Sequence, residues 1–398
     1  MTRRILITGA SIAGNTAAWW LGRSGFDVTV VERAPAFRDG GQNVDIRGVG
    51  REVLRRMDLE QAALDAGTGE TGTAWVDAQG RIVAQVVAPP GEDGPTAEME
   101  ILRGDLAKLI HAPAQEHATF RFDDWITAID EGADGVRVTF HSGSIEQFDH
   151  VLIAEGVGSA TREQVFPGEN DPRWMDMLCA YFTIPGQADD DRLWRWYTAT
   201  ERRSVSLRPD PYGTARATLT ALQPPGGEQD WPRERQQAWL RERFADAGWQ
   251  TPRVLAHMET TDDFYFDVLR QVRMPRWSKG RVVLLGDAAW CVTPLGGVGA
   301  TLAVTGAYVL AGELALHDDA ATAYDAYERA MRPMVEQAQG IPKFGPRLLH
   351  PRTRAGIAVL HRVLALATRP GLIKLFSRVF ASRPKTPDLS RYAALPTR

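Results

Sequence analysis

The pattern of hydrophobic residues near the start of the chain predicts a nucleotide-binding fold. Residues 5–8 form a continuous apolar run, residues 15–23 have helical spacing, and residues 28–31 form a second apolar run. A strand, a helix and a strand in so short a stretch predict a βαβ unit with two parallel strands. Gly9 and Gly14 lie at the turn between the first strand and the helix, where a tight turn and close helix–strand contact favour glycine.

The remaining pattern extends this unit into an α/β fold. An antiparallel meander over residues 119–149 is expected, leading into a buried strand at 151–154. Other runs that predict strands lie at residues 75–87, 193–197, 204–208, 215–222 and 280–285, and runs with helical spacing lie at 50–57, 106–117, 233–247, 300–315 and 361–380. We predict a Rossmann-like nucleotide-binding domain in two parts, 1–171 and 276–340. The first part carries an inserted sheet near 75–100. An antiparallel-sheet substrate domain over 172–275 separates the parts, and a helical region follows at 341–398.

The segment from Gly9 to Gly14 resembles the G-x-G-x-x-G fingerprint, with Ser11 in place of the middle glycine. Glu32 ends the second strand, 18 residues after Gly14, close to the roughly 20 expected for an acid that binds a ribose. Unpaired N–H groups at the start of the helix suit a pyrophosphate. We therefore favour a dinucleotide site over a glycine-rich turn that binds no phosphate.

A second glycine-rich segment predicts the other end of the same nucleotide site. The strand at 280–285 runs into Gly286 and Asp287, and a loop with Gly296, Gly297 and Gly299 then leads into a helix. A carboxylate at the carboxyl end of a parallel strand lies in the ligand crevice and accepts hydrogen bonds from sugar hydroxyls. The glycines before the helix can present N–H groups to negative charge.

A third glycine pair, Gly156 and Gly158, follows the strand at 151–154. It admits a second Rossmann interpretation with room for a nicotinamide nucleotide. No second βαβ unit with a terminal acid follows it, so we favour a turn that closes the first nucleotide-binding segment.

Residues 172–275 contain many tryptophans with arginines between them. Aromatic faces presented by a sheet can line a pocket for a flat apolar ligand, or they can simply cover the hydrophobic side of that sheet. We leave both interpretations open. The candidate substrate contacts in this region are Arg195, Trp196, Arg208 and Arg216.

Composition narrows the class of protein. The chain has 398 residues, 44% hydrophobic and 24% charged, enough for two or three domains with sizeable cores. Its two cysteines, Cys179 and Cys291, predict neither a disulfide framework nor a metal site, and they fit a reducing cytoplasm. We expect no membrane-spanning segment, no signal peptide and no nucleic-acid partner.

Charge is distributed unevenly. Residues 341–398 contain twelve Lys or Arg and one acid, Asp388, a net charge of +11, which leaves −4 − 11 = −15 for the rest. The amphipathic region at 361–380, interrupted at Pro370, could bind a membrane surface or a polyanion. We favour a terminal helical region that packs on the acidic body of the same chain, with its basic face in solvent.

Four segments, in this order along the chain, resemble the class A FAD-dependent aromatic hydroxylases. This family includes enzymes similar to para-hydroxybenzoate hydroxylase and the tetracycline-inactivating monooxygenases. The segments are Gly9–Gly14 with Glu32 and Arg33, the Arg103-Gly104-Asp105-Leu106 run, the Glu155-Gly156 segment through Arg162, and Gly286-Asp287 through Gly299. The resemblance covers most of residues 1–340 and implies a bound FAD.

The resemblance also implies roles for individual residues. Glu32 would bind the adenosine ribose, Arg33 would flank the adenine, Arg103 would approach FAD, and Asp287 would bind the ribityl chain. The segment from Pro294 to Gly299 would face the isoalloxazine. Candidate FAD contacts are Gly9, Ser11, Ile12, Ala13, Gly14, Glu32, Arg33, Arg103, Asp287, Gly297, Val298, Gly299 and Ala300; candidate catalytic residues are Asp45, Arg47 and Pro294; further candidate substrate contacts are Trp290, Leu295 and Gly296.

The implied reaction consumes NADPH or NADH and O2. The nicotinamide reduces FAD, oxygen adds to give a flavin C4a-hydroperoxide, and a hydroxyl group passes to a small aromatic, polycyclic or polyketide-like substrate. Baeyer–Villiger oxygenation, halogenation and a flavoprotein that only sequesters a ligand remain alternatives. The resemblance suggests a monomer or homodimer and no metal.

The sequence departs from the family pattern at several positions. Glu155 stands where the family has Asp before Gly156, Trp290 replaces the usual His, and Thr301 replaces the usual Asn. These departures leave open the role of Glu155 and the access of substrate near the flavin.

Overall fold

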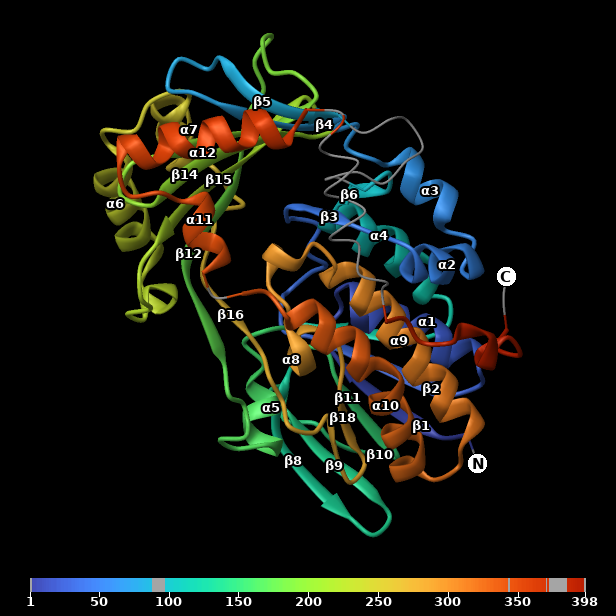
Figure 1. Cartoon of the computed structure of the whole chain (residues 1–398). Helices are drawn as coiled ribbons and strands as arrows, with labels where there is room; N and C mark the ends of the chain where they lie inside the picture. The colour runs from blue at the N-terminus through green and yellow to red at the C-terminus, as the bar shows by residue number, and fades with distance from the viewer. Residues whose placement is uncertain (1, 88–96, 343, 370, 372–384, 397–398) are drawn as a thin grey trace.

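The computed structural model describes residues 2–87, 97–342, 344–369, 371 and 385–396. Two large sheets, one of six strands and one of seven, organise the described chain. Figure 1 shows them in two lobes, with a short ribbon of two strands, β3 (Asn43–Asp45) and β6 (Glu100–Leu102), between them. The α/β class predicted from the sequence is confirmed.

The six-stranded sheet is the nucleotide-binding core predicted from the N-terminal pattern. Its central strands are buried apolar runs, which suits a parallel sheet covered on both faces. Its order is β17 (Ser278–Lys279), β18 (Val282–Leu284), β11 (His150–Ile153), β1 (Arg4–Thr8), β2 (Asp27–Glu32) and β7 (Thr119–Phe122). All neighbouring pairs are parallel except β17–β18. The sheet therefore joins the start of the chain to the segment before Asp287.

Helices cover this sheet and bury its apolar faces. The first, α1 (Ile12–Arg23), is almost wholly buried, and its Trp20 ring lies 4.5 Å from that of Tyr308 in α9. The helices of this lobe are α1, α2 (Val49–Arg56), α3 (Glu60–Asp65), α4 (Arg103–Ala114), α5 (Ala160–Val165), α8 (Asp287–Trp290), α9 (Gly299–Leu316) and α10 (Ala320–Gln339). By length and composition α9 could cross a membrane, but 78% of it is buried inside the protein, as in a core helix.

The predicted meander over residues 119–149 is only partly correct. Its first strand, β7, pairs in parallel with β2 in the main sheet. Only β8 (Ile126–Gly132), β9 (Gly135–Phe140) and β10 (Ile145–Phe148) form an antiparallel sheet of their own. The apolar alternation of the region shows that strands are present, but it does not specify their partners.

The seven-stranded sheet forms the second lobe. Its order is β16 (Tyr265–Gln271), β12 (Arg173–Pro185), β15 (Thr214–Leu222), β14 (Arg203–Pro209), β13 (Leu193–Ala199), β4 (Gly72–Val76) and β5 (Ile82–Val87). The hairpin near 75–100, predicted as an insert of the nucleotide-binding domain, thus extends this sheet instead, through a parallel β13–β4 pair. The sequence analysis also missed the long strand β12 and the edge strand β16.

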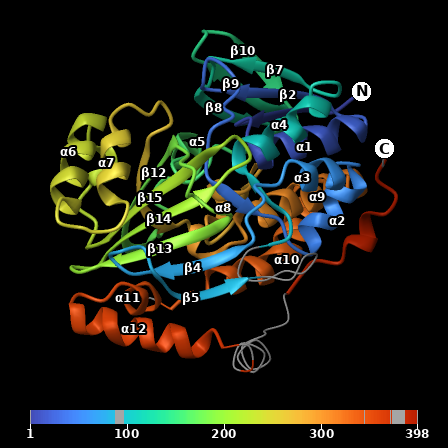
Figure 2. The same ribbon diagram turned by 90° about the horizontal axis from the view of Figure 1, so that it is seen from above.

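One face of the seven-stranded sheet packs on α6 (Arg233–Phe244) and α7 (Thr251–Met258). Figure 2, the view from above, shows these helices on the side of the sheet away from α1 and α4. Because side chains alternate along a strand, the opposite face carries the other half of each strand. That second face is directed toward the nucleotide-binding lobe.

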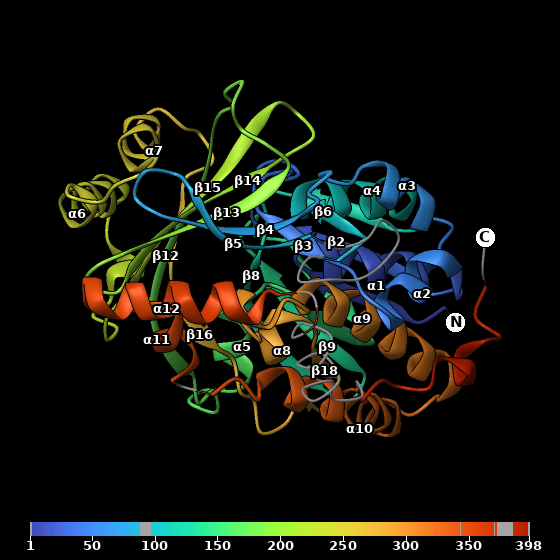
Figure 3. The same cartoon turned by 45° about the horizontal axis from the view of Figure 1, so that its top comes forward.

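The C-terminal region runs back across both lobes. The helix α11 (Gly345–Leu349) leads into α12 (Arg354–Ala367), which lies against β5, and a final turn, η3 (Leu389–Tyr392), packs on α9. Figure 3 shows α12 crossing in front of the seven-stranded sheet. Arg354 and Arg362 of α12 are exposed, but so are Val359, Val363 and Leu366, so the solvent face of this helix is apolar as well as basic, in contrast to the predicted basic face. Residues 372–380 of the predicted amphipathic region lie outside the described residues.

Candidate active site

The turn between β1 and α1 has the backbone geometry that the glycine pattern predicted. Gly9 has φ +99°, and an added Cβ would lie 2.4 Å from the carbonyl oxygen of Ala154. A Cβ on Gly14 would lie 1.9 Å from the carbonyl oxygen of Gly9. Ser11 begins α1 without a side-chain cap, so the first N–H groups of that helix have no side-chain partner and can bind an anion.

Arg103 ties this turn to a second loop. Its guanidinium donates to Ser11 Oγ (2.9 Å) and to the carbonyl oxygen of Gly40 (2.6 Å). Burial lowers the pKa of Arg103. The Ser11 hydroxyl, at the position of the missing middle glycine, therefore serves as an acceptor for the arginine of a distant motif.

Glu32 faces the same turn from the end of β2. Its carboxylate accepts hydrogen bonds from the backbone N–H of Ala10 (3.0 Å) and of Ala34 (2.9 Å). These bonds fix the acid at the mouth of the βαβ unit, the position from which a ribose would be bound. Arg33 beside it is exposed.

Asp287 brings the late glycine-rich segment to the same place. An added Cβ on Gly286, which has φ +64°, would lie 3.0 Å from Ala13 Cβ, so the two motifs predicted as ends of one site are in contact. Asp287 is exposed, although the protein around it raises the pKa of its carboxyl by desolvation. The positive charge of Arg103 acts in the opposite direction. The two segments, 272 residues apart, form one site.

The loop before α9 is strained and open. Thr293, a β-branched residue, has φ +69°, and its buried hydroxyl has no hydrogen-bond partner. Pro294 and Leu295 follow it and are exposed, and Gly297 has φ +61°. The helix then begins at Gly299 with no side-chain cap. Exposed loop and uncapped helix start together offer backbone N–H groups to a ligand.

Asp45 and Arg47 lie at the edge of this loop region. They form an ion pair of 2.9 Å. Thr301, in the first turn of α9, accepts from the Arg47 N–H (3.0 Å) and donates to the Asp45 carbonyl oxygen (3.3 Å). Thr301 thus fixes the strand β3 to the start of α9, which gives this departure from the family pattern a structural role.

Glu155, whose role the sequence left open, forms hydrogen bonds within the fold. Its carboxylate accepts hydrogen bonds from the hydroxyls of Thr8, Ser159 and Thr161 and from the Thr161 N–H. All of these partners lie within the fold. The acid holds the β11–α5 turn together, which agrees with the turn that we favoured over a second Rossmann site. Arg162 on α5 then donates to the Ala288 carbonyl oxygen (3.2 Å), beside Asp287.

The prediction that Trp290 contacts substrate is wrong. Its side chain is 1% exposed, and its ring lies 4.5 Å from that of Trp277 and 5.9 Å from that of Tyr327. An added Cβ on Gly306 of α9 would come within 2.9 Å of the indole. Trp290 fills the core beneath α9 because α8 turns it away from the loop.

The second face of the seven-stranded sheet carries hydroxyl and aromatic residues. Strand register places Ser206 of β14 between Trp196 of β13 and Thr218 of β15. Tyr181 and Tyr265 stack at one side, with ring centroids 6.3 Å apart. Tyr265 also lies close enough to Arg103 to influence the pKa of its guanidinium. This face of the sheet therefore carries small polar side chains between aromatic ones, and it lies opposite the residues of the FAD site.

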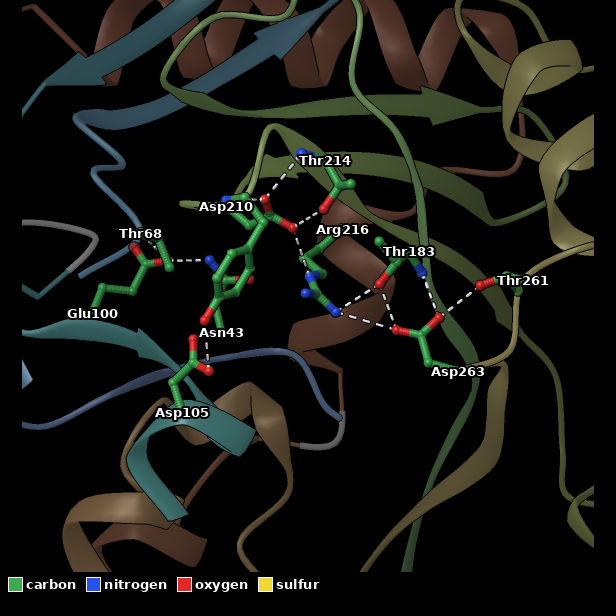
Figure 4. A network of polar contacts seen from close by, with 11 residues as sticks. Asn43, Thr68, Glu100, Asp105, Thr183, Asp210, Thr214, Arg216, Thr261 and Asp263 are labelled. Atoms are coloured by element: carbon green, nitrogen blue, oxygen red, sulfur yellow. Dashed lines mark hydrogen bonds and ion pairs between the residues drawn. The ribbon is translucent and has the colours of Figure 1, made fainter. Parts of the chain in front are cut away.

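The three predicted substrate arginines already have acidic partners in the chain. Arg195 pairs with Asp191 (2.7 Å), Arg208 with Glu70 and Glu100 (both 2.9 Å), and Arg216 with Asp210 and Asp263 (both 3.1 Å). Figure 4 shows Arg216 between Asp210 and Asp263, with Thr183 and Thr214 completing the network. The candidate substrate contacts Arg195, Arg208 and Arg216 are thus each engaged in ion pairs within the fold, and their contact with a substrate stays a prediction.

Tyr212 joins the two lobes at this network. Its hydroxyl donates to Asp105 of α4 (2.9 Å). Tyr212 lies in the β14–β15 turn, next to Asp210. The turn that carries Asp210 is thus fixed to the helix that begins at Arg103.

Sequence reasoning missed several residues of the site. Thr293, Thr73 and Asn43 carry no pattern of their own, and the sequence analysis assigned no role to Glu70 or Glu100. A β-branched residue before a proline and glycine pair was the one available signal for strain at Thr293.

Comparison with known proteins identifies the family of this chain. Residues 2–340 match the family model described as "FAD binding domain". An uncharacterized protein of Mycobacterium tuberculosis is 37% identical over 343 residues, covering 85% of this chain and 92% of its own. The FAD-dependent monooxygenase asL6 of Sarocladium schorii is 32% identical over 421 residues, with 99% of both chains covered. The structure of tetracycline destructase Tet(51) has a TM-score of 0.78 and 30% identity, covering 92% of this chain and 97% of its own.

Fold and site together define a flavoprotein oxidoreductase with two lobes. The chain belongs to the FAD-binding-domain family of flavin-dependent monooxygenases, the family that the four sequence segments indicated. It is an enzyme that binds FAD.

Proposed function

We propose that this monooxygenase consumes NADPH or NADH and O2 and hydroxylates an aromatic or polyketide-like small molecule held between the two lobes. One observation carries the proposal. Asp287, Arg103 and the exposed Pro294–Gly297 loop gather in one lobe, and the hydroxyl and aromatic face of the seven-stranded sheet lies opposite. A flat substrate placed between them would lie against the reactive part of FAD.

The site fits FAD on several independent points. The Gly9–Gly14 turn is so tightly packed that a Cβ on either glycine would clash with the backbone, as the turn of a dinucleotide site requires, and the starts of α1 and α9 both lack side-chain caps. Ser11, Glu32, Arg103 and Asp287 would hold the cofactor. When bound, FAD supplies electron transfer from the nicotinamide and activation of O2.

The chain's own residues then position the substrate and exclude water. Thr301 holds Asp45 and Arg47 in place beside the α9 loop, and the Asp45–Arg47 pair borders the space between the lobes. Trp196 and Tyr181 stand on the facing sheet and can enclose an apolar ring. A dry, pre-shaped space favours transfer of oxygen to substrate over loss of the reduced flavin's electrons to free O2.

The proposal is tested with the purified FAD-loaded enzyme and a panel of aromatic compounds that includes tetracycline. We expect at least one compound to stimulate NADPH or NADH oxidation, and its product to contain one oxygen atom from labelled O2 by mass spectrometry. A halogenated product in the presence of halide, or oxygen inserted into a carbon–carbon bond, would replace hydroxylation by an alternative chemistry. Tight binding of compounds without any stimulated oxidation would indicate a sequestering flavoprotein.

A further inference from the structure

Within the part of the chain that the structure describes, four buried polar atoms around Arg208 have no hydrogen-bond partner. They are Asn43 Oδ1, Thr73 Oγ1, Glu100 Oε2 and Trp194 Nε1. Buried polar groups in folded proteins almost always have partners, so a cluster of unpartnered ones needs an explanation. We refer to these four residues with Arg208 as the Arg208 chamber.

Thr73 and Trp194 form one wall of the Arg208 chamber. They are partners in the parallel register of β4 and β13, so their side chains leave the sheet on the same face. Thr73 is 4% exposed, and its hydroxyl, the one polar group of its side chain, has no partner. The Arg208 guanidinium lies over the Trp194 ring, 3.9 Å from its centroid. The unpartnered hydroxyl and indole N–H therefore lie beside a fixed arginine.

Glu100 and Asn43 form the facing wall. Glu100 Oε1 accepts from the Thr68 hydroxyl (3.1 Å), from the Asn43 side-chain amide, and from Arg208 (2.9 Å). Figure 4 shows the Asn43 and Thr68 contacts of this carboxylate. All three donors converge on one oxygen, and the other oxygen of Glu100, which is 3% exposed, receives none. Two acceptor oxygens, Glu100 Oε2 and Asn43 Oδ1, are thus left without donors.

The charges around the chamber leave no cation for an anionic ligand. Arg208 already pairs with Glu100 and with Glu70, whose side chain is fully buried. Burial raises the pKa of Glu70 to about 8, so near neutral pH its carboxyl is mostly protonated and Glu100 balances Arg208. Asp45 adds a further negative charge nearby. A carboxylate ligand would meet two acceptor oxygens and repulsion, whereas a hydrogen-bond donor would meet two acceptors and a net attraction.

One edge of the chamber reaches an open cavity. Arg208, together with Thr68, whose hydroxyl contacts Glu100, lines a cavity of about 610 Å³ at the end of the seven-stranded sheet, whereas Asn43, Thr73, Glu100 and Trp194 do not line it. The cavity is within the size range of small-molecule sites. The same sheet face continues from Arg208 through Ser206 toward the aromatic residues opposite the FAD site.

We propose that the Arg208 chamber is a specificity subsite that selects substrates carrying a neutral hydrogen-bond donor, such as a phenolic or alcoholic hydroxyl, and rejects carboxylates. This inference rests on the proposed function, since the ligand would be the substrate of that reaction. The hydroxyl would donate its one hydrogen to Glu100 Oε2, and the Thr73 hydroxyl and the Trp194 N–H would donate to its oxygen. Three of the four unpartnered atoms would then have a partner, and a ligand with a second donor would also reach Asn43 Oδ1.

The test uses the FAD-loaded enzyme and three probes that share one ring system, 2-naphthol, 2-methylnaphthalene and 2-naphthoate. Binding is followed by the change in the visible spectrum of the flavin, which needs no turnover. We expect 2-naphthol to bind at least tenfold more tightly than 2-naphthoate and more tightly than 2-methylnaphthalene. Glu100→Gln should reduce the preference over 2-naphthoate to within about threefold, because it removes the negative charge, and Thr73→Val should weaken 2-naphthol binding about threefold or more.

Thr305→Val is the matched control. Thr305 is fully buried in α9, and its hydroxyl also lacks a partner, but it lies outside the chamber. It should leave the order of the three probes unchanged. Absence of a preference in the unaltered enzyme, whether the probes bind equally or none binds, overturns the inference, as does a preference that Glu100→Gln leaves intact.

Failure of this inference and failure of the proposed function are distinguishable. If the probes show the donor preference but no panel compound stimulates NADPH or NADH oxidation, the subsite stands and the proposed reaction fails. If oxidation is stimulated equally by hydroxyl and carboxylate compounds, the reaction stands and the subsite fails.

Discussion

The two lobes differ in the groups that they offer to a ligand. In the nucleotide-binding lobe, recognition depends on turns and helix starts, and Asp287 remains exposed. On the face of the seven-stranded sheet, arginines and acids are buried against one another, as in the Arg216–Asp210–Asp263 network. The first lobe is built to accept one large, constant ligand through its backbone. The second is built from side-chain contacts, in which a change of one residue alters what fits.

This difference implies different sensitivities to mutation. A cofactor site made of backbone groups fails when the chain cannot adopt its conformation, and conservative side-chain changes elsewhere have little effect. A side-chain network responds to charge, and therefore to pH. The following predictions test each half of this contrast.

The largest effect is expected for Gly9→Ala. The new Cβ would meet the Ala154 carbonyl oxygen at 2.4 Å, and φ +99° is unfavourable for alanine. We expect loss of bound FAD, seen as loss of flavin absorbance after purification, and a free energy of unfolding lower by about 2–4 kcal/mol. Gly143→Ala is the control, since Gly143 has φ +86° with nothing within 4 Å. If both variants lose FAD equally, the close contact at Gly9 is not the cause.

Asp287→Ala should weaken FAD binding by about tenfold to a hundredfold, the usual effect of removing a charged hydrogen-bond acceptor. Among the described residues the exposed Asp287 carboxylate forms no hydrogen bond or ion pair, and only the charge of Arg103 acts on it, so the free energy of unfolding of the apoprotein should change little. A fluorescence titration with FAD measures the affinity, and denaturation of the apoprotein measures the free energy of unfolding. Asp134→Asn, in the exposed β8–β9 turn, should leave the FAD affinity unchanged.

The nucleotide-binding lobe could be predicted from sequence because its signals are local. Gly9, Glu32 and the apolar strands lie within one short segment, and backbone geometry alone dictates the residue types. The prediction of Asp287 required only the rule that ligands bind at the carboxyl ends of parallel strands.

The Arg208 chamber could not be predicted in this way. Its residues come from β3, β4, β6, β13 and β14, and strand register decides which of them meet. The β4–β5 hairpin was expected in the other lobe, but β4 pairs in parallel with β13, the strand that carries Trp194 and Trp196. No local sequence pattern specifies this pairing. The same limit explains Trp290, whose burial depends on how α8 packs beneath α9.

The next effect is spread over several pH units and comes from the titration of Glu70. Its pKa is raised from 4.5 to about 8 by burial, so between these values the unfolded chain loses a proton that the folded protein keeps. The free energy of unfolding of the wild-type protein should therefore fall, relative to Glu70→Gln, by up to about 1.4 kcal/mol per pH unit from pH 4.5 to 8 and then level off. Denaturation of both proteins at pH 5, 6.5, 8 and 9 measures this difference.

Glu146→Gln provides the opposite case. Hydrogen bonding to Arg121 lowers the pKa of Glu146. The ionised Glu146 carboxylate therefore stabilises the folded protein above pH 4.5, and this stabilisation is lost as the pH falls through the lowered pKa. The difference between the wild-type protein and this variant should thus be constant from pH 6.5 to 9. A constant difference for Glu70→Gln over the same range would show that Glu70 is ionised in the folded protein.

The smallest effect is expected at the contact between the lobes. Tyr212→Phe removes the hydrogen bond from the β14–β15 turn to Asp105, and because Tyr212 is 65% exposed the free energy of unfolding should fall by only about 0.5–1 kcal/mol. Hydrogen exchange should nevertheless become faster in both the turn and the start of α4, because the bond joins two lobes. Tyr265→Phe removes a similar bond to Asp267 within one strand, and its effect on exchange should stay within the seven-stranded sheet. Equal patterns in the two variants would mean that Tyr212 does not couple the lobes, and that the sheet face is held over the FAD site by the packing of other residues.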